Sequence, residues 1–425
     1  MERLIKFLND SPVNFLAAQA VVEELQRAGF EELSTRAKWT LAPGDRRYVV
    51  VNDSAVFAFV VGTGAPEEGF HIIAAHSDSP GFRIKPNCEM TGPEGILRLN
   101  TEVYGGPILY TWFDRPLSMA GRVVLRSHDP LNPRRVTVRF DRPLLTIPHL
   151  AIHFNRAVND GNKLSRQKDM LPVMALDCHE SKGLIRRLVA EKLGVEPDEV
   201  LDYDLSLYDT TPACTFGLND EFISAGRIDD LSMVHAALCA ITETADKPTR
   251  ATRVMAIFDN EETGSGTKQG AGSPVLEAIL RRVNLCTGGD AESFERAVAA
   301  SFLVSADNAH GFHPNYPEKY DPTNHPVLGG GPCIKINANC KYMTDADSAA
   351  VFAEICRMAG VPVQYFVNHS DSAGGSTLGN ILTGQMALRG VDMGAPVWAM
   401  HSVRETASTT DHLNTIAAFR QFFTL

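Results

Sequence analysis

The sequence predicts an α/β protein with a mixed, mostly parallel sheet flanked by helices and interrupted by a β-rich insert. Short apolar runs of strand length alternate with segments of helical period, which is the order of elements expected for a parallel sheet. Several of these runs end at a histidine or a carboxylate, as strands do where ligands collect at the carboxyl edge of an open sheet. Between residues 92 and 217, alternating apolar and polar residues and turn signals replace the helix–strand order.

The N-terminal part is predicted to hold a helix followed by three strands. Ser11 suits the N-cap and Pro12 the first helical position, and Gly29 suits the end of the helix. The strands are expected at residues 48–52, 56–61 and 71–75, the last of them leading into His76.

The middle of the chain is predicted to be a separate β-rich domain over residues 92–217. A half-exposed strand is expected at 136–140, a helix at 181–193 and a further strand at 201–208. Residues 1–91 and 218–425 then form one discontinuous domain, in which helix–strand alternation resumes. Its later elements are predicted as a helix at 231–241 and strands at 253–258, 301–305 and 396–400.

Composition narrows the classes of protein to consider. The chain has 425 residues, 44% of them hydrophobic, and a net charge of −11, which argues against nucleic acid or an anionic membrane as a partner. No apolar run approaches the ~20 residues of a membrane-spanning helix, and the N-terminus does not resemble a signal peptide. The eight cysteines are scattered without a C-x-x-C pair, which predicts reduced thiols and a cytoplasmic protein.

The pair Glu261-Glu262 follows the apolar run 254–258 and precedes a glycine turn. Adjacent carboxylates repel each other, so burying both is costly unless a cation or a shared proton compensates. Neighbouring side chains in an extended segment point to different sides. One glutamate could therefore hold a metal while the other transfers protons, although a solvated turn explains most such pairs.

Four predicted strands end at residues that can bind a metal, and a fifth such residue stands at a helix N-terminus. They are His76, Glu261-Glu262, Asp307 and His401 at strand ends and Asp229 before the helix. Two imidazoles and three carboxylates suit zinc, cobalt or manganese. Two divalent cations would balance three ligating carboxylates and one bridging hydroxide, and Asp229 is the natural bridging carboxylate. Asp78 could accept the second N–H of His76, or could simply cap a turn.

These motifs resemble the aspartyl aminopeptidase family of dinuclear zinc exopeptidases, and its bacterial members above all. The matching segments are His76-Ser77-Asp78, Arg227-Ile228-Asp229-Asp230, Asn260 to Ser265, Ser305 to His310 and Met400-His401-Ser402. The resemblance runs in order from near residue 10 to near residue 420. It implies a zinc-exopeptidase catalytic domain, a β-rich insert for subunit contacts or a lid, and a tetrahedral dodecamer with an enclosed chamber.

By this resemblance, one zinc would take His76, Asp229 and Asp307, and the other Asp229, Glu262 and His401. Glu261 would be the general base that deprotonates a water bridging the two zincs. The family often has Asp-Asn where this chain has Asp229-Asp230, so either aspartate could bridge, and alignment favours Asp229.

Three further residues are carried over. His153 would belong to an active site, that of its own or of a neighbouring subunit, either polarising the scissile carbonyl or binding metal. Lys335 and Tyr342 match the family's pocket for an acidic side chain. The family's Gln-Arg-Tyr is Cys340-Lys341-Tyr342 here, a departure that could shift the preference.

The predicted function is a two-zinc aminopeptidase, also active with cobalt or manganese, that removes N-terminal residues, acidic ones preferred, from short peptides with a free N-terminus. A broad-specificity aminopeptidase or a deacylase is the alternative within the same chemistry. A non-catalytic peptide-binding cage is the alternative from another class, and the presence of Glu261 argues against it.

Overall fold

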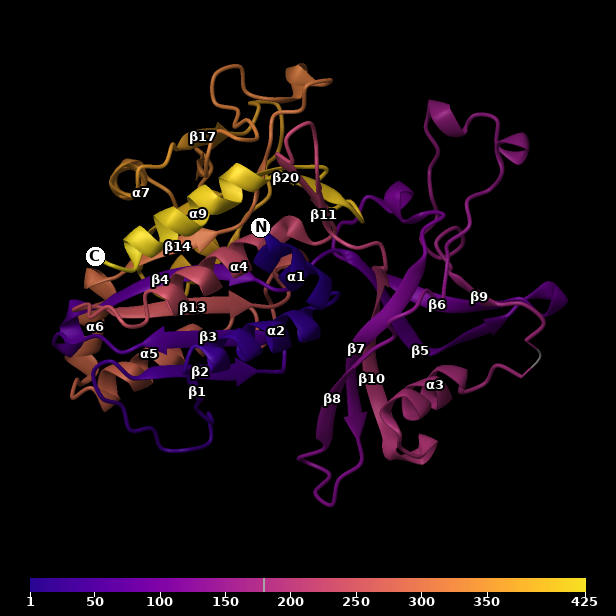
Figure 1. The fold of residues 1–425 in the computed structure, drawn as a ribbon, viewed down its shortest axis with the longest axis horizontal. Coiled ribbons are helices and arrows are strands. Elements are labelled where there is room, and N and C mark those ends of the chain that lie inside the picture. The colour runs from indigo at the N-terminus through magenta and orange to yellow at the C-terminus, as the bar shows by residue number, and fades with distance from the viewer. Residues whose placement is uncertain (179) are drawn as a thin grey trace. The chain divides into compact units, whose positions relative to one another are not determined.

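The computed structural model describes residues 1–178 and 180–425, and these fall into two compact units (Figure 1). The first unit comprises residues 1–78, 213–400 and 405–425, and the second comprises residues 79–212 and 401–404. The insert boundaries expected from the sequence were 91/92 and 217/218. The structure divides the chain after Asp78 and after Pro212, and assigns the short segment 401–404 to the second unit.

A nine-stranded mixed sheet forms the centre of the first unit, in the order β1-β2-β3-β13-β4-β14-β18-β16-β17. Most neighbours in it are parallel, including the central run β13, β4, β14 and β18. The strands are β1 (Glu31–Glu32), β2 (Arg46–Val51), β3 (Ala55–Val60), β4 (Phe70–His76), β13 (Thr252–Phe258), β14 (Phe302–Ala306), β16 (Cys333–Ile336), β17 (Gln364–Val367) and β18 (Arg389–Gly394). With helices on both faces, this sheet confirms the predicted fold class.

Helices cover both faces of this sheet. One face packs against α1 (Glu2–Asp10), α2 (Asn14–Arg27), α4 (Ile228–Glu243), α7 (Ala346–Ala359) and α9 (Thr409–Phe422). The other packs against α5 (Val275–Cys286), α6 (Ala291–Ala300) and α8 (Leu378–Thr383). The helix predicted to open at Ser11-Pro12 begins instead at Asn14, because residues 2–10 form a helix of their own and residues 11–13 connect the two.

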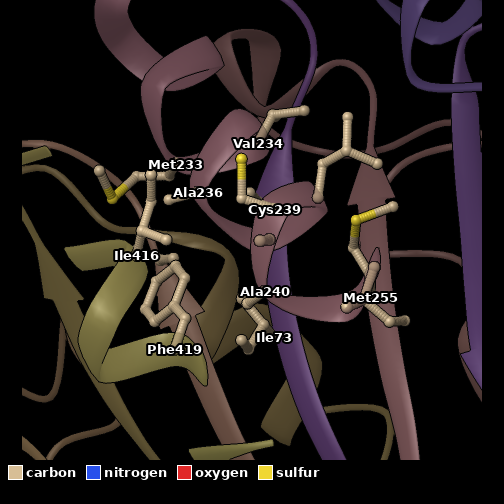
Figure 2. Packing of buried hydrophobic residues seen from close by; sticks show 14 of the residues in the cluster. Ile73, Met233, Val234, Ala236, Cys239, Ala240, Met255, Ile416 and Phe419 are labelled. Atoms are coloured by element: carbon tan, nitrogen blue, oxygen red, sulfur yellow. The ribbon is translucent and has the colours of Figure 1, made fainter. Parts of the chain in front are cut away.

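Alternate residues of the central strands feed the two cores. Met255 and Ile257 of β13 belong to the core under α4 and α9, whereas Val254, Ala256 and Phe258 belong to the core under α5. This alternation is the period of a strand, and burial on both faces explains why β13 is apolar throughout. Figure 2 shows Met233 and Ala236 of α4 close to Ile416 and Phe419 of α9.

A smaller five-stranded sheet, in the order β11-β12-β20-β19-β15, completes the first unit. Its strands are β11 (Cys214–Phe216), β12 (Phe222–Ala225), β15 (Ala309–His310), β19 (Pro396–Trp398) and β20 (Glu405–Ser408). The strand expected at 396–400 is therefore shorter than predicted and does not belong to the main sheet. Apolar content suggests a strand at this position but does not reveal which strand it pairs with. The segment pairs with β20, which follows it closely in the chain, and so belongs to the smaller sheet.

The second unit is built on a six-stranded antiparallel sheet in the order β8-β7-β10-β5-β6-β9. Its elements are β5 (Gly81–Thr91), β6 (Leu97–Tyr104), β7 (Leu117–Leu125), β8 (Arg134–Arg139), β9 (Val173–Ala175), β10 (Val200–Asp209) and α3 (Leu184–Leu193). A core of its own lies between the sheet and α3, with Val123, Leu205 and Val189 among its residues.

Across the described parts of the chain, the helices are too short or too polar to cross a membrane. All eight cysteines, which lie in those parts, are free thiols.

The stability of the first unit should depend on pH through His71 of β4. Burial, followed by the positive charge of Arg253, lowers the pKa of His71 to about 4, whereas an unfolded histidine titrates near 6.5. The folded state therefore binds fewer protons between these values, and stability falls as pH drops below 6.5. Between pH 7 and pH 5 this histidine should account for about 2 kcal/mol of the lost stability.

We expect His71→Phe to lose that much less stability than the wild type between pH 7 and pH 5, measured by urea unfolding. His128→Phe is the matched control, because His128 is exposed, and it should follow the wild type. Any metal lost in acid is common to all three proteins and cancels in the comparison. Parallel behaviour of His71→Phe and the wild type would contradict the assignment.

Candidate metal centre

The ends of three neighbouring strands bring most of the predicted ligands together. β4 lies between β13 and β14, parallel to both, and the last residues of β4 and β13 pair as His76 with Phe258. His76 closes β4, Asp307 follows β14, and Glu261 and Glu262 follow β13 in a short 3₁₀ turn. Parallel strands present their carboxyl ends at one edge, so side chains distant in sequence meet there.

The start of α4 supplies two more aspartates from the edge of the sheet. Arg227 precedes the helix in a left-handed conformation, and the Asp229-Asp230 peptide bond is cis. The Asp229 N–H donates to Oε2 of the buried Glu405 at 3.0 Å. The carboxylate of Asp230 accepts the backbone N–H of His76 at 3.1 Å and that of Asn308 at 3.3 Å. Asp230 thus ties the ends of β4 and β14 to α4.

The His76 imidazole points its two nitrogens at different carboxylates. Nε2 lies 3.7 Å from Oδ1 of Asp229. Nδ1 lies 3.1 Å from the backbone oxygen of Asp78 and 3.3 Å from its Oδ1. Burial alone would lower the pKa of His76, but the carboxylates of Asp230, Asp229 and Asp78 outweigh it and raise that pKa well above its usual value. Because Nε2 faces Asp229, it is the nitrogen directed at the acidic cluster.

Asp78 also fixes the turn that carries the glutamate pair. Its Oδ1 accepts the Glu261 N–H and its Oδ2 accepts the Glu262 N–H, both at 3.1 Å. One buried carboxylate therefore orients an imidazole and two backbone amides. The predicted role of the Asp78 carboxylate as acceptor for the His76 imidazole stays a prediction, and its two bonds to the glutamate turn are an addition that the sequence does not reveal.

The acidic groups converge closely enough to share a cation. One ligand atom from each of His76, Asp229, Asp230 and Asp307 lies within 4.8 Å of the others, and so does one from each of His76, Glu261 and Glu262. Burial raises the pKa of Asp230 and of Asp307. Burial, reinforced by Asp307, Glu262 and Asp78, also raises the pKa of Glu261 to about 8, even with His76 opposing. Imidazole and carboxylate donors in this number suit zinc, and a divalent cation would relieve the repulsion among them.

Lys335 and Tyr342 lie beside this cluster. Nζ of Lys335 is 3.5 Å from Oδ1 of Asp307 and 5.7 Å from the centre of the Tyr342 ring. Burial lowers the pKa of Lys335, but the negative charges of Asp307 and Asp392 raise it, so that the lysine stays charged. Asp392 of β18 is fully buried and accepts the Met343 N–H at 2.6 Å and the Thr377 hydroxyl at 2.6 Å.

Two predicted residues, His153 and His401, lie in the second unit. His153 is exposed in a short 3₁₀ turn, between the exposed apolar side chains of Ile152 and Phe154. His401 directly follows Met400, the last residue of that part of the first unit. Its Nδ1 faces the backbone oxygen of Gly106 at 3.1 Å, so Nδ1 carries the proton and Nε2 is the nitrogen that could bind metal. The part of either histidine in the cluster stays a prediction.

Sequence reasoning missed three buried acidic residues that organise this edge. Asp230 was considered only as a rival ligand, and its hold on two backbone amides has no signal in the sequence. Asp392 of β18 is the only charged residue between Gly390 and Ala395, which is a signal for a buried partner. Glu405 carries no such signal.

The chain is similar to known proteins over nearly its whole length. The model of the family "Aminopeptidase I zinc metalloprotease (M18)" matches residues 7–423. A probable M18 family aminopeptidase 2 from Clostridium acetobutylicum is 48% identical and covers 100% of this chain and 98% of its own length. A probable M18 family aminopeptidase 2 from Pseudomonas aeruginosa is 43% identical, covering 99% of this chain and 97% of its own.

Solved structures agree with the family match. A chain in the cryo-EM structure of the Ape4 and Nbr1 complex is 34% identical, with a TM-score of 0.96, and the match covers 100% of this chain and 85% of that one. The mApe1 dodecamer of yeast is 26% identical, with a TM-score of 0.87, and the match covers 99% and 95%. The family model and the relatives both match nearly the whole chain, and they support the same conclusion. This chain belongs to the M18 family of zinc aminopeptidases and is a peptide hydrolase.

Proposed function

We propose that this protein is a two-zinc aminopeptidase that removes the N-terminal residue of short peptides, with acidic residues preferred. The observation that carries the proposal is the buried convergence of His76, Asp229 and Asp307 beside the turn of Glu261 and Glu262. So many carboxylates in one buried cluster would repel one another without cations.

One zinc would be held by His76, Asp229 and Asp307, and the other by Asp229, Glu262 and His401. Asp229 is favoured over Asp230 as the shared ligand because both oxygens of Asp230 accept backbone N–H groups. Asp229 faces Nε2 of His76 with its Oδ1. Three ligating carboxylates match two divalent ions better than one.

Bound zinc would polarise the peptide carbonyl and lower the pKa of water. Glu261 would act as the general base, accepting a proton from the attacking water and returning it to the nitrogen of the departing amine. Asp78 serves both steps by fixing the backbone of Glu261 and the imidazole of His76. Because Asp78 binds two consecutive amides, the two glutamate side chains leave the turn in set directions.

Lys335 would receive the acidic side chain of the substrate, with Tyr342 beside it. The charge of Lys335 is shared with Asp307 at 3.5 Å. A ligating Asp307 would give much of its charge to the metal and leave Lys335 to attract an anionic substrate group. If Asp307 instead keeps its ion pair with Lys335, the lysine cannot attract an acidic substrate side chain. That case favours the alternative, an aminopeptidase of broader specificity.

We further propose self-assembly into a dodecamer, as in the yeast mApe1 structure, with the second unit making subunit contacts or a lid. The turn around His153 exposes 52% of Ile152 and 80% of Phe154, and exposed apolar residues grouped in this way are typical of interaction sites. His153 would then act in an active site of its own or of a neighbouring subunit, polarising the scissile carbonyl or binding metal. The free cysteines suit the cytoplasm.

The general base is tested by Glu261→Gln. The amide is nearly isosteric but cannot accept a proton, so turnover should fall by about 10²–10⁴-fold, the usual contribution of a positioned base. Zinc content, measured on the same sample, should be unchanged. Glu318→Gln is the control, since this glutamate is exposed. Near-normal turnover by Glu261→Gln would contradict the assigned base.

The acidic pocket is tested by release of a chromogenic amine from Asp-, Glu-, Leu- and Lys-anilides. The wild type should favour Asp and Glu, and Lys335→Met should lose most of that preference while retaining Leu-anilide turnover. Lys319→Met is the matched control, because Lys319 is exposed and lies outside the pocket motif. If the wild type cleaved Leu-anilide faster than Asp-anilide, the broad-specificity alternative would replace the acidic one.

A further inference from the structure

Asn260 directly precedes the glutamate turn and ties it to the loop that follows. It is buried, with 5% of its surface exposed, and its backbone has a φ of +63°. Its side-chain Oδ1 accepts hydrogen bonds from the Thr267 hydroxyl and from Nε2 of Gln269, both at 2.8 Å. Its backbone oxygen accepts the Ser265 N–H at 2.8 Å. One residue therefore joins the start of the turn to the loop that follows it.

The loop behind Asn260 is compact enough to act as a support. The Gly272 N–H donates to the backbone oxygen of Ser265 at 3.1 Å. A Cβ at Gly270 would lie only 2.4 Å from that same oxygen, so the loop closes on itself only with glycine there. This closure sets the positions of Thr267 and Gln269, the two donors to Asn260.

A second anchor reaches Asn260 from α2. Asp259 accepts the Asn260 N–H on Oδ1 at 2.8 Å and the side-chain N–H of Asn14 on Oδ2 at 3.0 Å. Asn14 is the first residue of α2 and is buried. The turn is thus connected both to α2 and to the closed loop, and all of these groups lie in the first unit.

We infer that Asn260 is a positioning residue for the reaction, acting through Thr267 and Gln269 to orient the side chain of Glu261. Asparagine suits this place twice, since it tolerates a left-handed backbone and supplies an acceptor that can bind two donors at once. Without that side chain the turn keeps its backbone bond from the Ser265 N–H but loses the bonds from Thr267 and Gln269. The inference rests on the proposed role of Glu261 as the general base.

The central variant is Asn260→Gly, which retains the left-handed backbone and removes the side-chain amide, including the Oδ1 acceptor of Thr267 and Gln269. Because misplacement by about 1 Å can cost on the order of 10²-fold, we expect kcat to fall at least tenfold. We expect KM and zinc content to stay within about twofold of the wild type. A residue that mattered only for folding would lower the fraction of active enzyme and leave kcat per active site unchanged, so kcat is normalised by active-site titration with a tight inhibitor.

Thr267 provides a test that does not threaten folding, because its side chain is exposed. Thr267→Val removes the donor and should lower kcat about fivefold, the scale of one hydrogen bond, whereas Thr267→Ser keeps the hydroxyl and should restore it. The double variant with Asn260→Gly should be no slower than Asn260→Gly alone, since both remove the same bond. Ser273→Ala is the control, because this hydroxyl bonds to Lys268 and Gly270 in the same loop and not to Asn260.

Assaying Glu261→Gln beside these variants distinguishes a failure of the proposed general base from a failure of the inference about Asn260. If Glu261→Gln is inactive and Asn260→Gly turns over within twofold of the wild type, the inference is wrong and the proposed base stands. If Glu261→Gln is active, the base assignment fails and the inference fails with it. Loss of zinc from Asn260→Gly, or equal kcat values for Thr267→Val and Thr267→Ser, would also overturn the inference.

Discussion

The constraint on which this structure depends is the burial of several carboxylates around one imidazole at the edge of the main sheet. Asp229, Asp230 and Asp307 lie close to His76, with Glu261 and Glu262 beside them. Burial of like charges costs several kcal/mol per group unless partners compensate. Backbone N–H groups compensate the charge of some of these carboxylates. The others converge closely enough for a cation to compensate them.

This division assigns different work to chemically identical side chains. Asp78 and Asp230 each accept two backbone N–H groups and so fix the ends of β4 and β14 and the glutamate turn. Asp229 and Asp307 are directed instead at Nε2 of His76 and at Nζ of Lys335. Asp78 and Asp230 therefore form their backbone hydrogen bonds whether or not a metal is bound. Such preorganisation keeps the remaining ligands in place without further rearrangement.

Much of this site could be predicted from the sequence, because the ends of parallel strands must meet. The apolar runs before His76, Glu261 and Asp307 indicate three strands, and these turn out to be neighbours in the sheet. The strand before His401 was assigned to the same sheet and lies in the smaller one, because apolar content does not reveal which strand a segment pairs with. Asp230 and Asn260 could not be assigned either, since their roles arise from hydrogen bonds to distant backbone and loop atoms.

The central claim is that Asp229 is shared between two zinc ions, and counting zinc per chain tests it most directly. Protein loaded with zinc and freed of excess metal should contain two zinc atoms per chain. Asp229→Ala should lose both, whereas Asp307→Ala, which in the proposed arrangement removes a ligand of one ion only, should retain one. A fully active wild type with a single zinc, or an Asp229→Ala variant that keeps two, would contradict the account.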